Sequence, residues 1–161
     1  HKTTHFTKEE MEGITKGLAG VDNIELLQIQ EFSAWRAIRF QNDIATPFPI
    51  QRGTVIPLDK DTFLIWTHGS VQHDELAGKK LNYYKNGRGI PAPLLVKRFM
   101  GKSSALELVN EILMLTKMNW NSGDGLYKIL PVTLDFAKAL SRVAKQDLVI
   151  YDRPYDFRYF M

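Results

Sequence analysis

The spacing of apolar residues along the chain predicts three helices. Two of them should begin with a capping box, in which Thr7 is followed by Glu10 and Ser104 by Glu107. The third should begin with Thr133 as its N-cap residue. The side chains expected on the buried faces recur every three or four positions. They are Met11, Ile14 and Leu18 in the first helix, Leu106, Val109, Leu113 and Leu115 in the second, and Leu134, Ala137, Leu140 and Val143 in the third.

Shorter apolar runs, bounded by turn-forming residues, predict four strands. They cover residues 24–29, 53–58, 62–68 and 94–99. The second and third of these strands are joined by three residues that include Asp59 and Asp61. Aspartate is a common turn residue, so we interpret this Asp-x-Asp pair as a hairpin turn rather than as a metal site. Strands and helices together predict an α/β fold, with a mixed sheet of four or five strands covered by helices.

Three further segments are expected to lack regular helix. Residues 42–51 contain two prolines and should form a loop or linker. Residues 69–89 form a polar stretch long enough to be a functional or mobile loop. Residues 31–40 mix aromatic side chains with Arg36 and Arg39, and should be an exposed strand or loop whose arginines are either solvated or bind an anion.

Composition narrows the classes of protein that the sequence can encode. With 161 residues, of which 44% are hydrophobic, the chain is long enough for one domain with a sizeable core. No apolar run approaches the ~20 residues that a membrane-spanning helix needs, so we expect no membrane partner. The absence of cysteine excludes disulfides, cysteine metal ligands and cysteine nucleophiles. It is compatible with a reducing compartment, and we expect a cytoplasmic protein.

Charge is more informative locally than over the whole chain, whose formal net charge is only +3. No acidic residue occurs between Glu75 and Glu107. The same stretch contains seven cations, which are Lys79, Lys80, Lys85, Arg88, Lys97, Arg98 and Lys102. Two tyrosines and several glycines lie among them, a combination that suits a phosphate backbone. The alternative is a basic loop that is simply solvated.

Between the second and third predicted helices lies a polar elbow. Its sequence, NWNSGDG at residues 119–125, consists mainly of residues that favour turns over helix. The elbow therefore places amides, hydroxyls and nearby lysines at the mouth between two helices. Such a mouth is suited to a polyanion rather than to an apolar ligand.

The segment EILMLTKMNWNSGDGLYKILPVTLDFAKALSRV, which contains this elbow, resembles the C-terminal part of the PIWI domain of prokaryotic Argonaute proteins. The blocks HKTTHFTKEEMEG, RGTVIPLDKDTFLIWTHGSV, GIPAPLLVKRFMG and the aromatic end FRYFM continue the resemblance over nearly the whole chain. It implies an RNase H-like fold, with residues 1–161 forming the C-terminal part of a PIWI domain. Because the chain begins at His1, partway through the family pattern, we expect a fragment of a longer Argonaute.

The resemblance implies binding of a guide strand and of a complementary target, with sequence read by base pairing. Four residues around the elbow would face guide phosphates near the 5′ end. They are Lys117, Asn119, Asn121 and Lys128. Lys85 and Arg88, in the basic stretch, would contact nucleic acid further along. Where some relatives carry basic residues after a strand, this chain has Gln30 and Glu31, so Arg36 and Arg39 are expected to substitute for them.

The resemblance also implies a metal ion. The chain ends with an aromatic tail, residues 151–161, which should pack against the fold rather than fray. In the family, the terminal carboxylate approaches a divalent cation that binds the guide 5′ phosphate. We therefore expect the Met161 carboxylate to contact Mg²⁺ or Mn²⁺, because a cation is needed between a carboxylate and a phosphate. The alternative is a tail that only covers the core.

Active members of the family cleave with clustered carboxylates that hold two divalent ions. The position matching the third of these carboxylates falls at residues 1–4, which contain none, and the fourth falls on Lys138. An ammonium group cannot ligate Mg²⁺, so we predict a catalytically inactive member that is not an enzyme. A shifted alignment that makes Asp135 a displaced ligand is the alternative within this site.

Partners implied by the resemblance are the MID domain, the rest of the Argonaute and a separate effector such as a nuclease, a TIR domain or a sirtuin-like domain. The biological role would be host defence against invading DNA. The sequence favours neither DNA nor RNA, because backbone contacts dominate and no base-reading motif is visible. Two competing hypotheses remain. One is an active guide-dependent endonuclease with its carboxylates upstream, and the other is a protein-interaction module that docks an effector through residues 31–40 and the aromatic tail.

Overall fold

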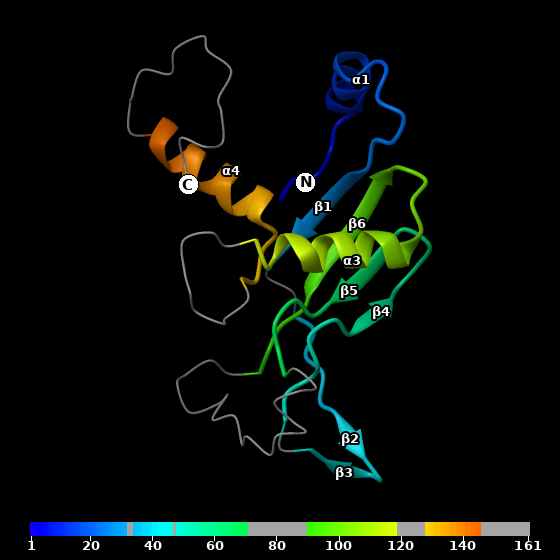
Figure 1. Ribbon diagram of the computed structural model, residues 1–161, viewed down its shortest axis with the longest axis vertical. Coiled ribbons are helices and arrows are strands. Elements are labelled where there is room, and N and C mark those ends of the chain that lie inside the picture. The colour runs from blue at the N-terminus through cyan, green and yellow to red at the C-terminus, as the bar shows by residue number, and fades with distance from the viewer. Residues whose placement is uncertain (32–33, 47, 71–89, 119–127, 146–161) are drawn as a thin grey trace.

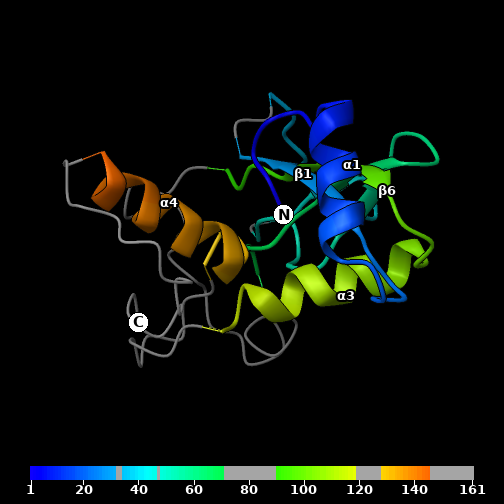
Figure 2. The same ribbon diagram turned by 90° about the horizontal axis from the view of Figure 1, so that it is seen from above.

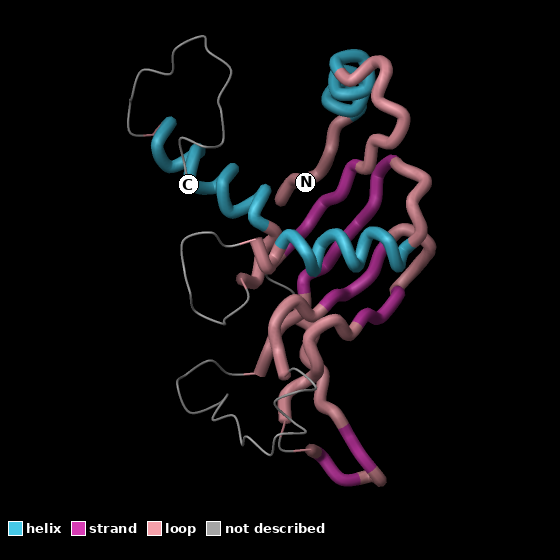
Figure 3. The backbone as a smooth tube through the Cα atoms, viewed as in Figure 1, coloured by secondary structure: helices cyan, strands magenta, loops and turns pink. Residues whose placement is uncertain are grey.

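The central element of the fold is a four-stranded sheet. A computed structural model describes residues 1–31, 34–46, 48–70, 90–118 and 128–145. Within them, the sheet has the strand order β1-β6-β5-β4. These strands are β1 (Leu26–Gln30), β4 (Val55–Pro57), β5 (Thr62–Ile65) and β6 (Leu94–Met100). Each of the three neighbouring pairs is antiparallel, and helix α3 crosses one face of the sheet (Figures 1, 2 and 3).

The first residues of the chain add a parallel contact at the outer edge of β1. Lys2 forms an isolated parallel bridge with Gln28. The Lys2 N–H donates to the Leu27 carbonyl at 3.0 Å, and the Ile29 N–H donates to the Lys2 carbonyl at 2.8 Å. The sheet thus combines antiparallel and parallel pairing, and the predicted α/β fold with a mixed sheet flanked by helices is confirmed.

Two helices begin at the predicted capping boxes. Helix α1 (Lys8–Gly17) follows Thr7, and helix α3 (Ala105–Leu115) follows Ser104. In each capping box the cap side chain accepts a backbone hydrogen bond, and the glutamate three residues on accepts one from the cap N–H. These bonds satisfy amide groups that have no partner inside the helix.

Helix α4 (Val132–Ala144) begins two residues earlier than predicted, so Thr133 is not its N-cap. Pro131 occupies that place, and its carbonyl accepts bonds from the N–H groups of Leu134 and Asp135 at 3.0 and 3.2 Å. A proline lacks a backbone donor, and none is needed before the first helical turn. The Thr133 hydroxyl instead lies 2.8 Å from His1 Nδ1.

The main core lies between α3, the start of α4 and one face of the sheet. It contains Leu27, Ile29, Phe63, Ile65, Leu94, Val96, Leu108, Val109, Ile112, Leu130 and Leu134. The predicted buried face of α3 was partly wrong, because Leu106 is 70% exposed while Leu108 and Ile112 are buried. Ala137 on α4 is exposed as well. Apolar residues occur on more than one side of α3, so spacing alone did not select the side that faces the sheet.

The opposite face of the sheet has a smaller cluster, formed by Ile50, Leu64 and Trp66. The Trp66 indole N–H donates to the Pro91 carbonyl at 3.1 Å, which satisfies its buried polar atom. Ala37 and Leu95 pack against this cluster. The contact with Ala37 fixes the segment that leaves β1 onto the sheet.

A second, two-stranded sheet projects away from the first (Figure 1). It consists of β2 (Phe40–Gln41) and β3 (Ile44–Ala45), joined by Asn42 and Asp43. Both turn residues have positive φ, 51° and 61°, as a tight hairpin turn requires. This hairpin corrects the prediction of a loop at residues 42–51. Asn and Asp tolerate positive φ better than other non-glycine residues, so the pair was a readable hairpin signal.

The turn between β4 and β5 agrees with its predicted role. The Asp61 N–H donates to the Asp59 side chain at 2.8 Å, which is the local bond of an aspartate turn. The Asp61 carboxylate in turn pairs with Arg98 of β6 at 3.2 Å. Among the helices of the described residues, none has the length and apolar character that crossing a membrane requires.

Candidate nucleic-acid interface

The predicted elbow is bounded by two described segments, residues 116–118 after α3 and residues 128–131 before α4, which together we call the neck. At one side of this neck, the Lys128 N–H donates to the Thr116 carbonyl at 3.2 Å. Beside it, the Thr67 hydroxyl donates to the Ile129 carbonyl at 2.6 Å and ties the neck to the residue after Trp66. Residues 119–127, including Asn119 and Asn121, lie outside the described residues. The structure therefore shows how the two ends of the elbow are held together.

Arg52 stabilises the α3 side of the neck. Its guanidinium donates to the Leu113 carbonyl at 2.8 Å, to the Thr116 hydroxyl at 2.9 Å and to the Thr67 carbonyl at 2.8 Å. The carboxyl end of a helix carries a partial negative charge, which would repel an anionic ligand. A cation bonded to the last carbonyls offsets that charge, and charge-assisted bonds are stronger than neutral ones. Arg52 thus makes this end of α3 more acceptable to a phosphate.

His68 lies in the same region and is largely shielded from solvent. Burial lowers the pKa of its imidazole, and the positive charge of Arg52 lowers this pKa further. Its Nδ1 atom is buried and has no hydrogen-bond partner in the described part of the chain. His68 is therefore held in its neutral form at pH 7, and the cationic character of the neck comes from arginine and lysine.

The two lysines predicted to face phosphate lie at the ends of the elbow. Lys117 is exposed at the end of α3, and its N–H donates to the Met114 carbonyl at 2.9 Å. Lys128 is half-buried, and its Nζ lies 2.8 Å from the Asp135 carboxylate. Because its side chain is exposed whereas that of Lys128 is half-buried, Lys117 is the more solvent-accessible of the two cations. Asp135, considered above as a displaced metal ligand, takes part in this ion pair instead.

The other predicted nucleic-acid contacts are only partly described. Arg36 is exposed on the segment between β1 and β2, where its guanidinium donates to the Trp35 carbonyl at 2.7 Å. Arg39 is partly buried, and its carbonyl accepts from the Thr46 N–H at 2.9 Å at the base of the hairpin. Lys85 and Arg88 lie outside the described residues. The structure does not place Arg36 or Arg39 in the neck.

Of the two positions assigned to the degenerate catalytic site, the first lies beside α4 and the second lies on it. His1 contacts Thr133 in its first turn, and Lys138 forms an ion pair with Glu31, the residue that follows β1. Sequence reasoning identified Lys138 but gave Glu31 no partner. An ammonium bonded to the nearest carboxylate does not fit a divalent cation at this position.

The described residues contain no group of three or more His, Cys, Asp or Glu side chains that could hold a metal ion. The predicted Mg²⁺ or Mn²⁺ would instead be held at the Met161 carboxylate. Met161 and the rest of the tail, residues 146–161, lie outside the described residues, so this metal site stays a prediction.

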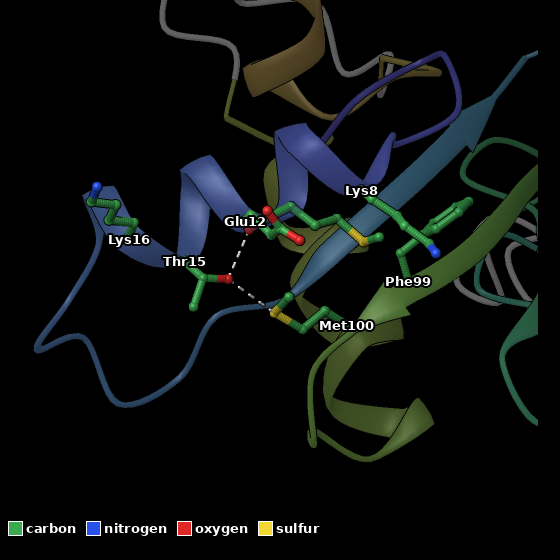
Figure 4. Close-up of a pocket in the computed structure, with 7 residues that line it drawn as sticks. Lys8, Glu12, Thr15, Lys16, Phe99 and Met100 are labelled. Atoms are coloured by element: carbon green, nitrogen blue, oxygen red, sulfur yellow. Dashed lines mark hydrogen bonds between the residues drawn. The ribbon is translucent and has the colours of Figure 1, made fainter.

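A separate groove lies between α1 and the end of β6 (Figure 4). Its volume is about 560 Å³, within the range of small-ligand clefts. Met11, Phe99 and Met100 give it an apolar lining, while Lys8 and Lys16 lie at its edges with Glu12 between them. The Thr15 hydroxyl donates to the Met11 carbonyl at 2.8 Å and approaches the Met100 sulfur at 3.9 Å. The groove holds no cluster of groups suited to acid–base or metal chemistry.

Sequence reasoning gave no role to three residues that shape this interface, namely Arg52, Glu31 and His68. The partners of Arg52 and Glu31 lie far away in the chain, since Arg52 and Thr116 are 64 positions apart and Glu31 and Lys138 are 107 apart. The one signal in the sequence was that Arg52 stands directly before a glycine, Gly53. In the structure Gly53 has a φ of +89°. A positive φ turns the backbone sharply and is readily adopted by glycine.

Comparison with known proteins supports the fold. The chain is similar to a crystal structure of Aa-Ago, an Argonaute, with externally bound siRNA, at a TM-score of 0.62 and 20% sequence identity. The match covers 98% of this chain but only 19% of that one, so the chain spans about a fifth of the length of the Argonaute. No family model and no curated protein matches the sequence. The chain therefore has an Argonaute-like fold.

Proposed function

We propose that this chain is part of an Argonaute-like protein that binds a guide strand and its complementary target without cutting the target. The observation that carries the proposal is the neck pinned by Arg52, on a fold shared with an Argonaute. The neck joins the two ends of the polar elbow, and Arg52 offsets the negative charge at the end of α3. A strand of phosphates is the ligand for which this arrangement is suited.

In this proposal, the elbow contacts the guide near its 5′ end through Lys117, Asn119, Asn121 and Lys128. Lys85, Arg88, Arg36 and Arg39 contact the backbone elsewhere. Contacts with phosphate carry no sequence information, so base pairing with the target supplies the specificity. Mg²⁺ or Mn²⁺, held by the Met161 carboxylate, would neutralise the repulsion between that carboxylate and the guide 5′ phosphate.

The position of Lys138 is the reason for proposing that the protein does not cleave the target. The ion pair between its ammonium group and Glu31 puts a positive charge where the family pattern has a metal ligand. A protein that binds without cutting would act in host defence through a separate effector, and would use the MID domain to complete the guide site. These partners are part of the proposal.

Binding of a 5′-phosphorylated guide to the full-length protein tests the proposal, with Mg²⁺ present or absent and with salt varied. Replacing Lys117 and Lys128 with glutamine should weaken binding and reduce the slope of log affinity against log salt by roughly 0.7 for each lost phosphate contact on a single strand. Lys60→Gln is the matched control, because the Lys60 side chain is 91% exposed in the turn between β4 and β5.

Deleting the last three residues should weaken Mg²⁺-dependent binding if the tail carboxylate holds the ion. Target integrity is followed in the same samples. Absence of guide binding at low salt would contradict the proposed function. Cleavage of the target would contradict the assignment of Lys138 to an inactive site and favour an active endonuclease.

A further inference from the structure

The segment that leads into the β2–β3 hairpin presents one face to solvent. Ala37 and Arg39 are partly buried, whereas Arg36, Ile38 and Phe40 are exposed. This alternation is typical of an extended chain with one side turned outward. Ile38 and Phe40 are each 62% exposed, an unusual position for two large apolar side chains two residues apart.

The hairpin itself extends this face. Phe40 pairs with Ala45 across the two strands, and directly opposed residues lie on the same side of a sheet. Ile44, which pairs with Gln41, lies on the other side and is 72% exposed. Among the described residues no further strand pairs with this hairpin, and a two-stranded hairpin is at best marginally stable in water, so its exposed apolar side favours a bound partner. We name Arg36, Ile38, Phe40 and Ala45 the outer hairpin face.

Charge indicates which partner suits this face. The outer hairpin face carries the cation Arg36, and the one acidic residue between Glu31 and Asp59 is Asp43. A cation and an aromatic ring on one face are the combination that binds single-stranded nucleic acid, since the ring stacks on a base while the cation meets the backbone. An apolar groove on a protein partner would complement Ile38 and Phe40 but would not call for Arg36.

We propose that the outer hairpin face binds a nucleobase, with the Phe40 ring stacked on the base, Ile38 beside it and Arg36 near the adjacent phosphate. This inference rests on the proposed function, because it adds a base contact to a protein that otherwise grips backbone. The contact tolerates any sequence, since every base has a π-face. It places one unpaired or terminal base of the bound strand on the hairpin.

The test uses the full-length protein and 5′-phosphorylated guide strands that carry 2-aminopurine at one position each. Phe40→Ala should weaken binding by roughly 5- to 150-fold, the range expected for losing a stacked base. It should leave the salt slope unchanged, because no phosphate contact is removed. At one guide position, 2-aminopurine fluorescence should be quenched in the wild-type complex and recover in the variant.

Two further variants separate stacking from disruption of the hairpin. Phe40→Trp should retain both binding and quenching, whereas Ile44→Ala, on the other side of the same hairpin, should leave both unchanged. Equal losses in Phe40→Ala and Ile44→Ala would overturn the proposal, and so would wild-type affinity in Phe40→Ala. Affinity kept in Phe40→Ala together with lost binding to a protein effector would assign the face to that effector and overturn it too. Failure of the wild-type protein to bind any strand would instead contradict the proposed function.

Discussion

Lys138 on α4 forms an ion pair with Glu31 directly after β1, although 107 positions separate the two residues in the chain. The pair joins the last described helix to the edge strand of the sheet. Their side chains are 40% and 24% exposed, so solvent screens the interaction only in part. The pair thus has a structural role in addition to its bearing on catalysis.

The first prediction concerns the strength of this pair. In a double-mutant cycle with Lys138→Met and Glu31→Gln, we expect a coupling free energy of about 0.5–1 kcal/mol, the upper range for partly exposed pairs. Unfolding in urea measures it. A coupling near zero would mean that the two charges contribute independently, and high salt should reduce any coupling that is observed.

The second prediction concerns Arg52. Arg52→Ala removes three charge-assisted hydrogen bonds at the neck, and should lower the free energy of unfolding by roughly 2–3 kcal/mol. Arg52→Lys should recover only part of this loss, because an ammonium group does not reproduce a planar guanidinium with several donors. Urea unfolding provides the measurement, with Arg142→Ala on the exposed side of α4 as the control.

If the neck positions the elbow, Arg52→Ala should also weaken guide binding. The loss should exceed that of Lys60→Gln, which removes one charge far from the neck. Guide affinity should be compared without denaturant, at a temperature well below the unfolding midpoint of the variant, so that both proteins are folded. Full guide affinity in Arg52→Ala would show that the neck is not needed to hold the elbow.

The third prediction concerns pH. The folded protein lowers the pKa of His68, so the unfolded state binds a proton more readily than the folded state does. The contribution of His68 to stability is therefore complete above its unfolded pKa of roughly 6.5, and is lost as the pH falls below that value. His68→Gln should make the free energy of unfolding less dependent on pH between about 7 and 5. Equal pH slopes in the two proteins would contradict the assignment.

The fourth prediction contrasts the two capping boxes. Ser104→Ala should lower the free energy of unfolding by about 1 kcal/mol, because α3 contributes Leu108 and Ile112 to the main core. Thr7→Ala should have a smaller global effect, because α1 has no buried residue. Its loss should appear as faster amide hydrogen exchange confined to α1. Ser104→Asp is the control that keeps a capping side chain.

The sequence alone determined the features that depend on neighbouring residues. The capping boxes at Thr7 and Ser104 and the aspartate turn at Asp59 follow from bonds between residues two or three positions apart. Their residue types specify them without regard to the rest of the fold. The α/β fold class followed from the same local periodicities, and the structural likeness to an Argonaute agrees with the resemblance read from the motifs.

The tertiary structure determined the buried face and the first residue of helices for which the sequence allowed several choices. Leu106 and Leu108 are both apolar, and the position of α3 over the sheet buried the second and exposed the first. The N-cap position of α4 is Pro131 rather than the predicted Thr133, because the Pro131 carbonyl could serve the first turn. In both cases the local preferences are nearly equal, so packing determined the outcome.

The candidate interface divides in the same way. Lys117 and Lys128 could be named from their sequence context beside a polar elbow, and the structure places both at its ends. Arg52 and Glu31 could not be named, because their bonds to Thr116 and Lys138 connect parts of the chain that only folding brings together. The sequence shows which side chains are charged, whereas the close packing of distant elements determines which charges form pairs.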